Sequence, residues 1–433
     1  MNQLKFSDLG LADPIQLALK TRNHDTPTPI QQEAIPELLK GSDVLGIAQT
    51  GTGKTGAFAL PILHKLSKNQ PKDKRREPRA LILAPTRELA IQIGEEIAAY
   101  GQNLQLRHTV IFGGVKQNPQ VNALRRGIDI IVATPGRLLD LMSQGFIDLN
   151  GCAFLVLDEA DRMLDMGFVH DVRKIVSALP NKRQSLLFSA TMPKEIARLS
   201  GDMLNNPVRI EVTPQATPIE SITQNIYHVG AADKTKLLSS IMDDPSLSKV
   251  IVFTRTKHRA NRVADKLGKS GVDAEAIHGN KSQGARQRAL SRFRAGEARV
   301  LVATDIAARG IDVDGVTHVI NFELPNEPES YVHRIGRTAR AGAGGAAVSF
   351  CDPGERAYLR DIERLIQKSL TVIGDGPEAI GPETAPEKQG GNGRRNGQRN
   401  GQRKPSGGAG FKRGKRRGGR GRKQSAGGHA AHA

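Results

Sequence analysis

Short runs of apolar residues recur along roughly the first 350 residues, and stretches of helical periodicity separate them. The runs in the first half predict strands at residues 44–48, 80–84, 109–112, 128–133, 154–157 and 185–188. A second series predicts strands at residues 249–253, 274–277, 300–303, 318–321 and 346–350. Because strands that alternate with helices build parallel sheets covered by helices, the pattern predicts an α/β fold.

The alternation is broken once, by a Pro- and Thr-rich stretch at residues 211–222, where we place a linker between two domains. A chain of 433 residues can fill two cores, since single domains usually contain about 100–200 residues. A Lys- and Arg-rich surface loop is expected at residues 69–78. The sequence therefore predicts an N-terminal segment at residues 1–32 and a first domain at 33–210. The linker at 211–222 leads to a second domain at 223–373, and a tail follows at 374–433.

Positive charge is concentrated in the tail. The formal net charge of the chain is +19, and residues 388–433 hold 14 Lys and Arg with no Asp or Glu. Such a Gly-rich segment cannot bury a core, so we expect it to be disordered. Its charge favours a polyanionic partner, and RNA is the candidate. A purely solubilising tail, or one that contacts proteins or ribosomes, remains an alternative.

Secretion and membrane insertion are not expected. The N-terminus lacks an apolar signal region, and no run of about 18 apolar residues occurs. We therefore expect a cytoplasmic protein without a membrane partner. Cys152 and Cys351 lack metal-type spacing, and we expect both to be buried thiols without a metal or redox role.

A glycine- and threonine-rich loop follows the first predicted strand and precedes a helix expected to begin near Lys54. Backbone N–H groups of such a loop can surround phosphate oxygens, Lys54 can neutralise their charge, and Thr55 can ligate Mg²⁺. A chance Gly-rich turn is the alternative, which the flanking strand and helix disfavour. The predicted phosphate-binding residues are Ala48, Gln49, Thr50, Gly51, Thr52, Gly53, Lys54 and Thr55.

Two acidic residues, Asp158 and Glu159, end another predicted strand. Next to a phosphate loop, Asp158 would hold Mg²⁺, largely through water, and Glu159 would orient and deprotonate an attacking water. On their own, such acids could merely favour the start of a helix. Together with Lys54 and Thr55 they predict an ATP- and Mg²⁺-dependent hydrolase.

A dense cationic cluster, His333 to Arg340, lies in the second half of the chain. Arginines aimed at a γ-phosphate stabilise the charge that develops during phosphoryl transfer. A solvated or RNA-facing basic surface is the alternative. The cluster lies in the second predicted domain, opposite the phosphate loop of the first, and this placement favours a catalytic role for Arg334 and Arg337.

The ordered set of motifs over about residues 1–370 resembles the DEAD-box ATP-dependent RNA helicases, and the bacterial RhlE-like branch in particular. The tetrapeptide Asp158-Glu159-Ala160-Asp161 carries the resemblance most directly. The other matching segments are 27–31 with Phe6, 85–89, 113–114, 134–137, 189–191, 252–255, Gln283 with Arg286, 303–312 and 333–340. The resemblance implies two tandem RecA-like (P-loop) parallel-sheet domains, with an ATP-binding domain at 33–210 and a helicase C-terminal domain at 223–373.

The resemblance also implies roles for individual residues. Phe6, His24 and Gln31 would contact adenine and favour ATP over GTP, and Asp305 would contact the ribose. Arg334 and Arg337 would be the arginine fingers. Residues that would couple hydrolysis to domain movement are Ser189, Thr191, Asp161 and His333. Residues that would contact RNA without reading its bases are Pro85, Thr86, Arg87, Gly113, Gly114, Thr134, Gly136, Arg137, Thr254, Arg255, Gln283, Arg286 and Thr304.

Two positions depart from the family pattern. Asn23-His24 replaces a Gly-aromatic pair, which predicts weaker stacking on adenine, and Ala339 replaces a glycine. A DNA-translocating helicase and a non-catalytic RNA scaffold are the rival functions, and the motif at 85–89 and the complete catalytic set argue against them. Ribosomal particles or a nuclease complex are compatible partners.

Overall fold

The computed structural model describes residues 4–49, 51–69, 77–212, 222–308, 311, 313, 315–339 and 344–375. Several predictions lie outside the described residues: Thr50, Arg309, Gly310, Asp312, Arg340, most of the basic loop at 69–78, most of the linker at 211–222, and the tail beyond residue 375.

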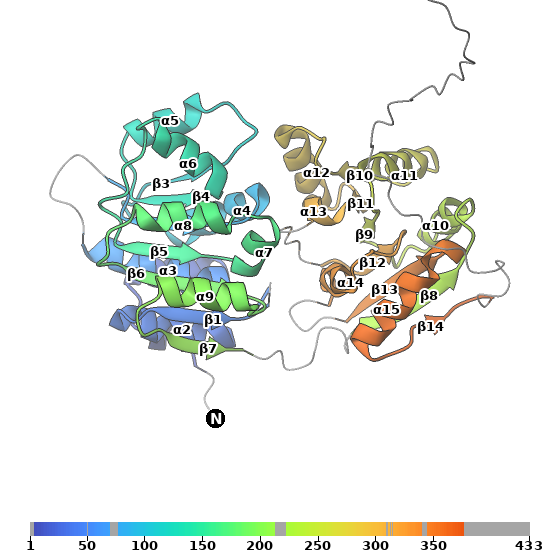
Figure 1. Ribbon diagram of the computed structural model, residues 1–433, viewed down its shortest axis with the longest axis horizontal. Helices are drawn as coiled ribbons and strands as arrows, with labels where there is room; N and C mark the ends of the chain where they lie inside the picture. Colours follow the sequence, from blue (N-terminus) through green and yellow to red (C-terminus); the bar gives the residue numbers. More distant parts are fainter. Residues whose placement is uncertain are drawn as a thin grey trace, which may run out of the picture. The chain divides into compact units, whose positions relative to one another are not determined.

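The first domain contains a seven-stranded sheet, with the order β3-β4-β2-β5-β6-β1-β7 and every pair parallel (Figure 1). Its strands are β1 (Val44–Ile47), β2 (Ala80–Leu83), β3 (His108–Ile111), β4 (Ile130–Ala133), β5 (Phe154–Leu157), β6 (Gln184–Ser189) and β7 (Val208–Glu211). Its helices are η1 (Phe6–Leu9), α1 (Asp13–Thr21), α2 (Pro29–Lys40), α3 (Lys54–Lys68), α4 (Arg87–Tyr100), α5 (Asn118–Arg125), α6 (Pro135–Ser143), α7 (Ala160–Asp165), α8 (Val169–Ser177) and α9 (Lys194–Met203).

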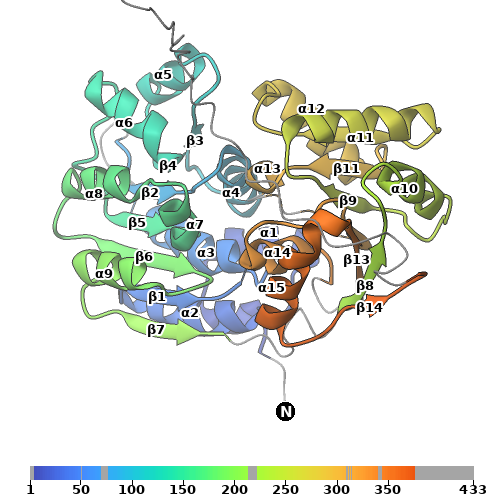
Figure 2. The same cartoon turned by 45° about the vertical axis from the view of Figure 1, so that its right-hand side comes forward.

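Helices cover both faces of this sheet, which explains why its central strands are apolar throughout (Figure 2). Along β2, Ile82 packs into one core with helices α1 to α4, whereas Leu81 and Leu83 face the other core with α6 to α9. Successive side chains of a strand point to opposite faces, so two cores require continuous apolar runs.

The second domain contains another parallel seven-stranded sheet, with the order β10-β11-β9-β12-β13-β8-β14. Its strands are β8 (Ile222–His228), β9 (Val250–Phe253), β10 (Ala274–Ile277), β11 (Val300–Ala303), β12 (His318–Asn321), β13 (Gly345–Cys351) and β14 (Thr371–Val372). Its helices are α10 (Lys234–Met242), α11 (Lys257–Lys269), α12 (Gln283–Ala295), α13 (Asp305–Ala308), α14 (Pro328–Ile335), η2 (Pro353–Glu355) and α15 (Arg356–Ile366). Numbered from the first strand of each domain, the two sheets have the same strand order.

A buried ion pair marks the start of α10. The Lys234 side chain is 2% exposed, and its ammonium pairs with the buried Glu355 carboxylate and, at 3.0 Å, with Asp352. An ammonium so far from water needs such partners.

The α/β fold predicted from the sequence is confirmed, and every predicted strand overlaps an observed one. Strands β7, β8 and β14 were not predicted. The predicted linker is wrong at its ends, because Glu211 closes β7 and Ile222 opens β8. These strands lie at or near the edge of a sheet and alternate apolar with polar residues, so they lack the continuous apolar run of a central strand.

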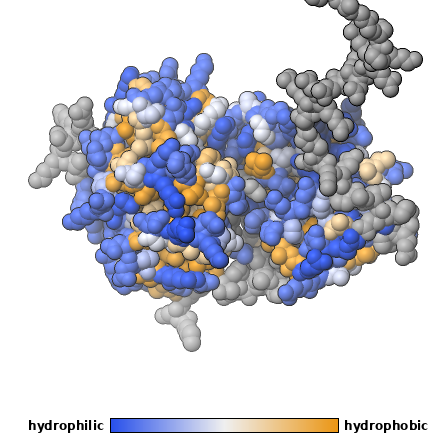
Figure 3. Space-filling view, in the orientation of Figure 1, coloured by the Kyte–Doolittle hydropathy of each residue, from blue (hydrophilic) through white to orange (hydrophobic). Residues whose placement is uncertain are grey.

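The surface of the described residues is mixed. Hydrophilic residues cover much of the face drawn in Figure 3, with hydrophobic ones between them. Among the described residues, no helix has both the length and the apolar character needed to cross a bilayer. Cys152 and Cys351 are buried free thiols, and burial raises the pKa of each to about 12.

Candidate active site

The strand order divides the carboxyl edge of the first sheet into two halves. Strands β5, β6 and β1 are neighbours, and the motifs that follow them begin at Asp158, Ser189 and Ala48. Strands β3, β4 and β2 form the other half, followed by Gly113, Thr134 and Pro85. The predicted nucleotide residues therefore gather on one half of the edge, and the predicted RNA residues on the other.

The phosphate loop leads from β1 into α3, which begins at Lys54 as predicted. Gly51 and Gly53 have φ values of 88° and 89°, a conformation that glycine adopts without strain. The Lys54 ammonium donates to the carbonyl of Ala48 at 3.0 Å and lies 4.0 Å from Asp158. Its side chain is 5% exposed, so the amino group lies at the helix start with little water around it.

Gln31 connects the N-terminal segment to the phosphate loop. Its Oε1 accepts from the backbone N–H of Thr28 at 2.9 Å, which completes a capping box at the start of α2. Its Nε2 donates to the carbonyl of Gly53 at 3.0 Å. A Cβ on Gly53 would lie 2.7 Å from this Nε2, so the loop approaches Gln31 more closely than a side chain would allow.

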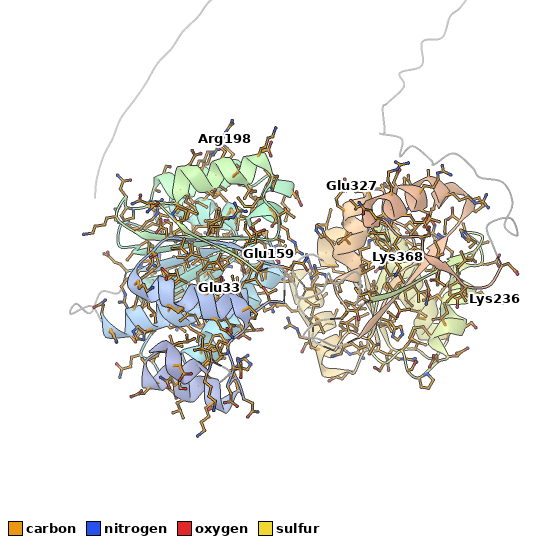
Figure 4. The ribbon with its side chains drawn as sticks, turned by 90° about the horizontal axis from the view of Figure 1, so that it is seen from below. Glu33, Glu159, Arg198, Lys236, Glu327 and Lys368 are labelled. Atoms are coloured by element: carbon orange, nitrogen blue, oxygen red, sulfur yellow. The ribbon has the colours of Figure 1, made fainter. Side chains whose placement is uncertain are left out.

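The acidic pair lies at the end of β5, buried beside Lys54. The Asp158 side chain is 3% exposed, and burial raises its pKa against the lowering effect of Lys54. Glu159 adopts a left-handed backbone with φ 54°, which is strained for a residue with a Cβ. Figure 4 labels Glu159 in the first domain, apart from the outward-facing Glu33 and Arg198.

Ser189, Asp161 and Thr191 form one hydrogen-bonded cluster next to the acidic pair. The Asp161 Oδ2 accepts from the N–H of Ala190 at 3.1 Å, the N–H of Thr191 at 2.9 Å and the Thr191 hydroxyl at 3.1 Å. The Ser189 hydroxyl donates to the carbonyl of Thr191 at 2.8 Å and accepts from the N–H of Asp161 at 3.2 Å. The loop after β6 is thereby tied to the helix that carries the acidic motif.

A cavity of about 600 Å³ joins these groups. Its lining includes Phe6, His24 and Gln31 together with Lys54, Thr55 and Asp158. Thr55 and Asp158 are oxygen donors of the kind that Mg²⁺ prefers. Within the described ranges, His, Cys, Asp and Glu do not gather in threes to make a metal site. In proteins Mg²⁺ usually keeps several waters and binds through one or two carboxylates and substrate phosphates.

The predicted RNA residues of the first domain lie around a second cavity of about 550 Å³, lined by Pro85, Thr86, Arg87, Gly113, Thr134, Gly136 and Arg137. The Thr86 hydroxyl caps α4 by accepting from the N–H of Leu89 at 3.3 Å. Gly114, with φ 77°, lies against Arg87, since a Cβ there would be 2.1 Å from the guanidinium. Arg137 pairs with Asp140 at 3.3 Å.

In the second domain, Arg334 is committed to structural partners. Its Nε and second Nη donate to the two oxygens of Asp305 at 2.5 and 2.8 Å. Its first Nη donates to Asn321 at 3.1 Å and to the carbonyl of Glu323 at 2.7 Å, and the ring of Phe253 lies 5.1 Å away. The side chain is 1% exposed. This geometry disagrees with a predicted phosphate-facing role for Arg334, because four of its five donors are already used.

Arg337 is less firmly held. Within the described part of the chain it donates to the backbone carbonyls of Ile311 at 2.9 Å and His333 at 3.2 Å, and burial, with repulsion from Arg162, lowers its pKa to about 9. Ala339, where the family pattern has glycine, has φ 53°. A left-handed alanine costs about 1–2 kcal/mol relative to a right-handed one, so this departure carries a strain that glycine would avoid.

The remaining predicted RNA residues of the second domain differ in exposure. Thr254 is buried, whereas Thr304 is partly exposed. Arg255 is held by Glu355 at 3.2 Å and Glu323 at 3.8 Å.

The helix start at α12 brings two predicted RNA residues to one carboxylate. Gln283 donates to Glu88 Oε1 at 2.9 Å, and Arg286 pairs with Glu88 Oε2 at 3.0 Å. Glu88 directly follows Arg87, which is itself a predicted RNA contact. In this structure the predicted RNA residues Gln283 and Arg286 therefore bond to the residue next to Arg87.

Sequence reasoning missed residues that line the nucleotide cavity, Tyr100 among them, and also Arg162, which contacts one of the lining residues. Arg162 donates to Glu159 at 2.6 Å, and its spacing of three residues on a helix was an available signal. Tyr100 lines the cavity from the far end of α4, and no local pattern indicated it.

Comparisons with known proteins agree with this geometry. Residues 28–199 match the family model for the DEAD/DEAH box helicase, and residues 233–342 match the helicase conserved C-terminal domain. The DEAD-box ATP-dependent RNA helicase CshA of Bacillus cereus is 43% identical over 365 residues, which cover 84% of this chain and 69% of the relative. CshA of Bacillus subtilis is 43% identical over 367 residues, covering 85% and 73%.

Solved structures are similar over most of the chain. S. cerevisiae Dbp5 bound to RNA and ADP BeF3 has a TM-score of 0.75 and 32% identity, covering 85% of this chain and 95% of that one. Mss116p bound to ssRNA and AMP-PNP has a TM-score of 0.76 and 29% identity, covering 88% and 81%. This chain therefore belongs to the DEAD-box ATP-dependent RNA helicases, RNA-dependent ATPases that unwind or remodel RNA with the energy of ATP hydrolysis.

Proposed function

We propose that the cavity beside the phosphate loop is the ATP site and that hydrolysis takes place between Lys54 and Glu159. The observation that carries this proposal is the buried pair of Lys54 and Asp158, 4.0 Å apart, in a cavity that Gln31 also lines. A buried cation and a carboxylate with a raised pKa suit a site that binds a metal-phosphate complex.

The proposed roles follow from position. The loop N–H groups and Lys54 bind phosphates, Gln31 contacts adenine, and Glu159 orients and deprotonates the water that attacks the γ-phosphate. Thr55 and Asp158 would hold Mg²⁺, which neutralises phosphate charge when bound. Arg337 serves as an arginine finger.

We further propose that Arg334 positions Asp305 instead of contacting the γ-phosphate. With Asp305 held in this way, its outer surface is available for the ribose. The cluster of Ser189, Thr191 and Asp161 links hydrolysis at the acidic motif to a movement of the loop after β6. His333 takes part in the same coupling from the second domain.

RNA is proposed to lie along the half of each sheet edge that follows β2, β3 and β4 in the first domain and β9, β10 and β11 in the second. Glycine N–H groups and hydroxyls there suit backbone contacts without base recognition. Binding of ATP and RNA together would close the domains, and hydrolysis would reopen them.

The setting of this activity is also a proposal. With the linker ends corrected, segments 1–32, 33–211, 222–373 and 374–433 are proposed as functional units, the last as an electrostatic tether for RNA. A cytoplasmic location, the RhlE-like branch and partners such as ribosomal particles or a nuclease complex rest on the motif set and on the basic tail.

Steady-state ATPase assays test the site. The full chain, a version ending at Gly374 and Lys54→Ala would be compared with single-stranded RNA, matched DNA or no nucleic acid. We expect stimulation by RNA that survives removal of the tail and is lost in Lys54→Ala, while the exposed Lys68→Ala on the same helix stays active. Equal stimulation by DNA would favour a DNA motor, and activity in Lys54→Ala would place the ATP site elsewhere.

A further inference from the structure

The nucleotide cavity extends beyond the predicted adenine contacts to three residues without a role so far. Arg22, Glu96 and Tyr100 line it together with His24. Arg22 and His24 come from the turn that ends α1, whereas Glu96 and Tyr100 come from the last turns of α4. Elements far apart in sequence thus meet where the base would lie.

The contacts among these side chains form a chain that ends at His24. The Arg22 guanidinium donates to Glu96 Oε1 at 2.8 Å and lies 5.1 Å from the centre of the Tyr100 ring. The His24 ring lies on the same tyrosine, with centroids 6.3 Å apart and planes inclined at 54°. Tyr100 is 5% exposed, so its buried ring is a fixed surface that both the Arg22 guanidinium and the His24 imidazole approach.

The backbone fixes His24 at this place. Asn23 has φ 56°, a left-handed conformation that asparagine tolerates, and the N–H of His24 donates to the carbonyl of Leu19 at 3.0 Å. These backbone bonds fix the position of the turn but not the orientation of the His24 side chain. Neighbouring side chains are needed to hold its ring.

Helix α4 presents one face to the cavity. Leu89, Gln92, Glu96 and Tyr100 all line it and are spaced three or four residues apart. A helical face is a rigid support, which a loop alone would not provide.

We propose that Arg22, Glu96 and Tyr100 are positioning residues that hold the His24 ring against adenine and so set nucleotide affinity. The proposal rests on the proposed ATP site. His24 offers less stacking surface than the aromatic residue of the family pattern. The pair Arg22–Glu96 and Tyr100 compensate by restricting the His24 ring to one position. Stacking does not distinguish bases, so this cluster acts on affinity for purines in general, whereas Gln31 acts on the choice between them.

The test measures nucleotide affinity in Arg22→Ala, Glu96→Gln and the charge-swapped pair Arg22→Glu with Glu96→Arg. Competition of ATP and of GTP against a fluorescent ADP analogue gives both affinities, and ATPase assays separate KM from kcat. We expect each single variant to weaken ATP and GTP by the same factor, about three- to fivefold, since the pair is partly exposed. The kcat at saturating ATP should not change, and the swapped pair should recover most of the affinity. Glu33→Gln, an exposed carboxylate on α2, is the matched control.

Unchanged affinity in both single variants, or a swapped pair no better than the single ones, would overturn the proposal. Gln31→Ala separates this outcome from failure of the proposed site. If Gln31→Ala reduces the preference for ATP over GTP while the Arg22 and Glu96 variants bind normally, the ATP site stands and the positioning role falls. If Gln31→Ala leaves the preference intact, the adenine site itself is wrong.

Discussion

Replacing Arg334 by glutamine should lower the stability of the second domain. It should lower kcat much less than the loss of Arg337 does. The change removes four hydrogen bonds, two of them to the Asp305 carboxylate, from a side chain that is 1% exposed. Breaking a buried ion pair costs about 3–5 kcal/mol. Asp305 keeps 28% of its side chain exposed and is partly resolvated, so the lower end of that range, about 3 kcal/mol, applies.

The expected thermal shift follows from the size of the domain. For domains of about 150–250 residues, 1 kcal/mol lowers Tm by about 2–4 °C, so a loss of 3 kcal/mol lowers it by about 6–12 °C. Arg334→Lys should recover only a part, since an ammonium cannot reproduce the two parallel bonds to Asp305.

Arg337→Gln is the matched comparison. Among the described residues Arg337 donates to two backbone carbonyls, and burial lowers its pKa, so its loss should lower Tm by no more than about 2 °C, because burying a charge without a paired carboxylate is costly rather than stabilising. Loss of an arginine finger instead lowers kcat by about 10³-fold or more.

Differential scanning calorimetry on the full chain and RNA-stimulated ATPase measured well below the lowest Tm supply the two readouts. An Arg334→Gln protein with unchanged Tm and a kcat as low as that of Arg337→Gln would refute the assignment, since both arginines would then act on the phosphate.

Three further predictions use the same chain. Gly46→Ala should cost about 1–3 kcal/mol in urea unfolding, because its Cβ would lie 2.5 Å from the Phe188 ring; an unchanged midpoint would mean that the ring moves aside. His64 accepts a hydrogen bond from the N–H of Ala12 at 3.0 Å, and burial lowers the pKa of its imidazole. The free energy of unfolding should therefore decrease as the pH falls below about 6.5, the unfolded pKa, towards the folded pKa. In His64→Gln the urea midpoint should depend less on pH between about pH 7.5 and 5.5. Asp161→Asn should reduce unwinding per ATP hydrolysed in a paired helicase and ATPase assay, since an amide cannot accept all three donors of the loop after β6; an unchanged ratio would remove the coupling role.

The sequence predicted the central strands and the phosphate loop because both depend on local constraints. Strands such as β5 must be apolar on both faces, and the start of α3 needs glycines and Lys54 in a fixed order. The partner of Arg334 could not be predicted in this way, since it lies 29 residues away on another element and depends on which strands are neighbours. The same holds for Tyr100, which reaches the nucleotide cavity only because α4 packs beside α3.

The shared strand order of the two sheets has a consequence for phosphate binding. Lys234 begins the helix after the first strand of its sheet, as Lys54 does in the other, so the two lysines are topological counterparts. Among the described residues the carboxylate paired with Lys54 is that of Asp158, at 4.0 Å, and the proposed site leaves the ammonium available to a phosphate. The ammonium of Lys234 is instead neutralised by Glu355 and Asp352, and residues 229–233, which precede it, contain a single glycine. The second domain thus holds its own carboxylates at the place that corresponds to the proposed phosphate site of the first domain.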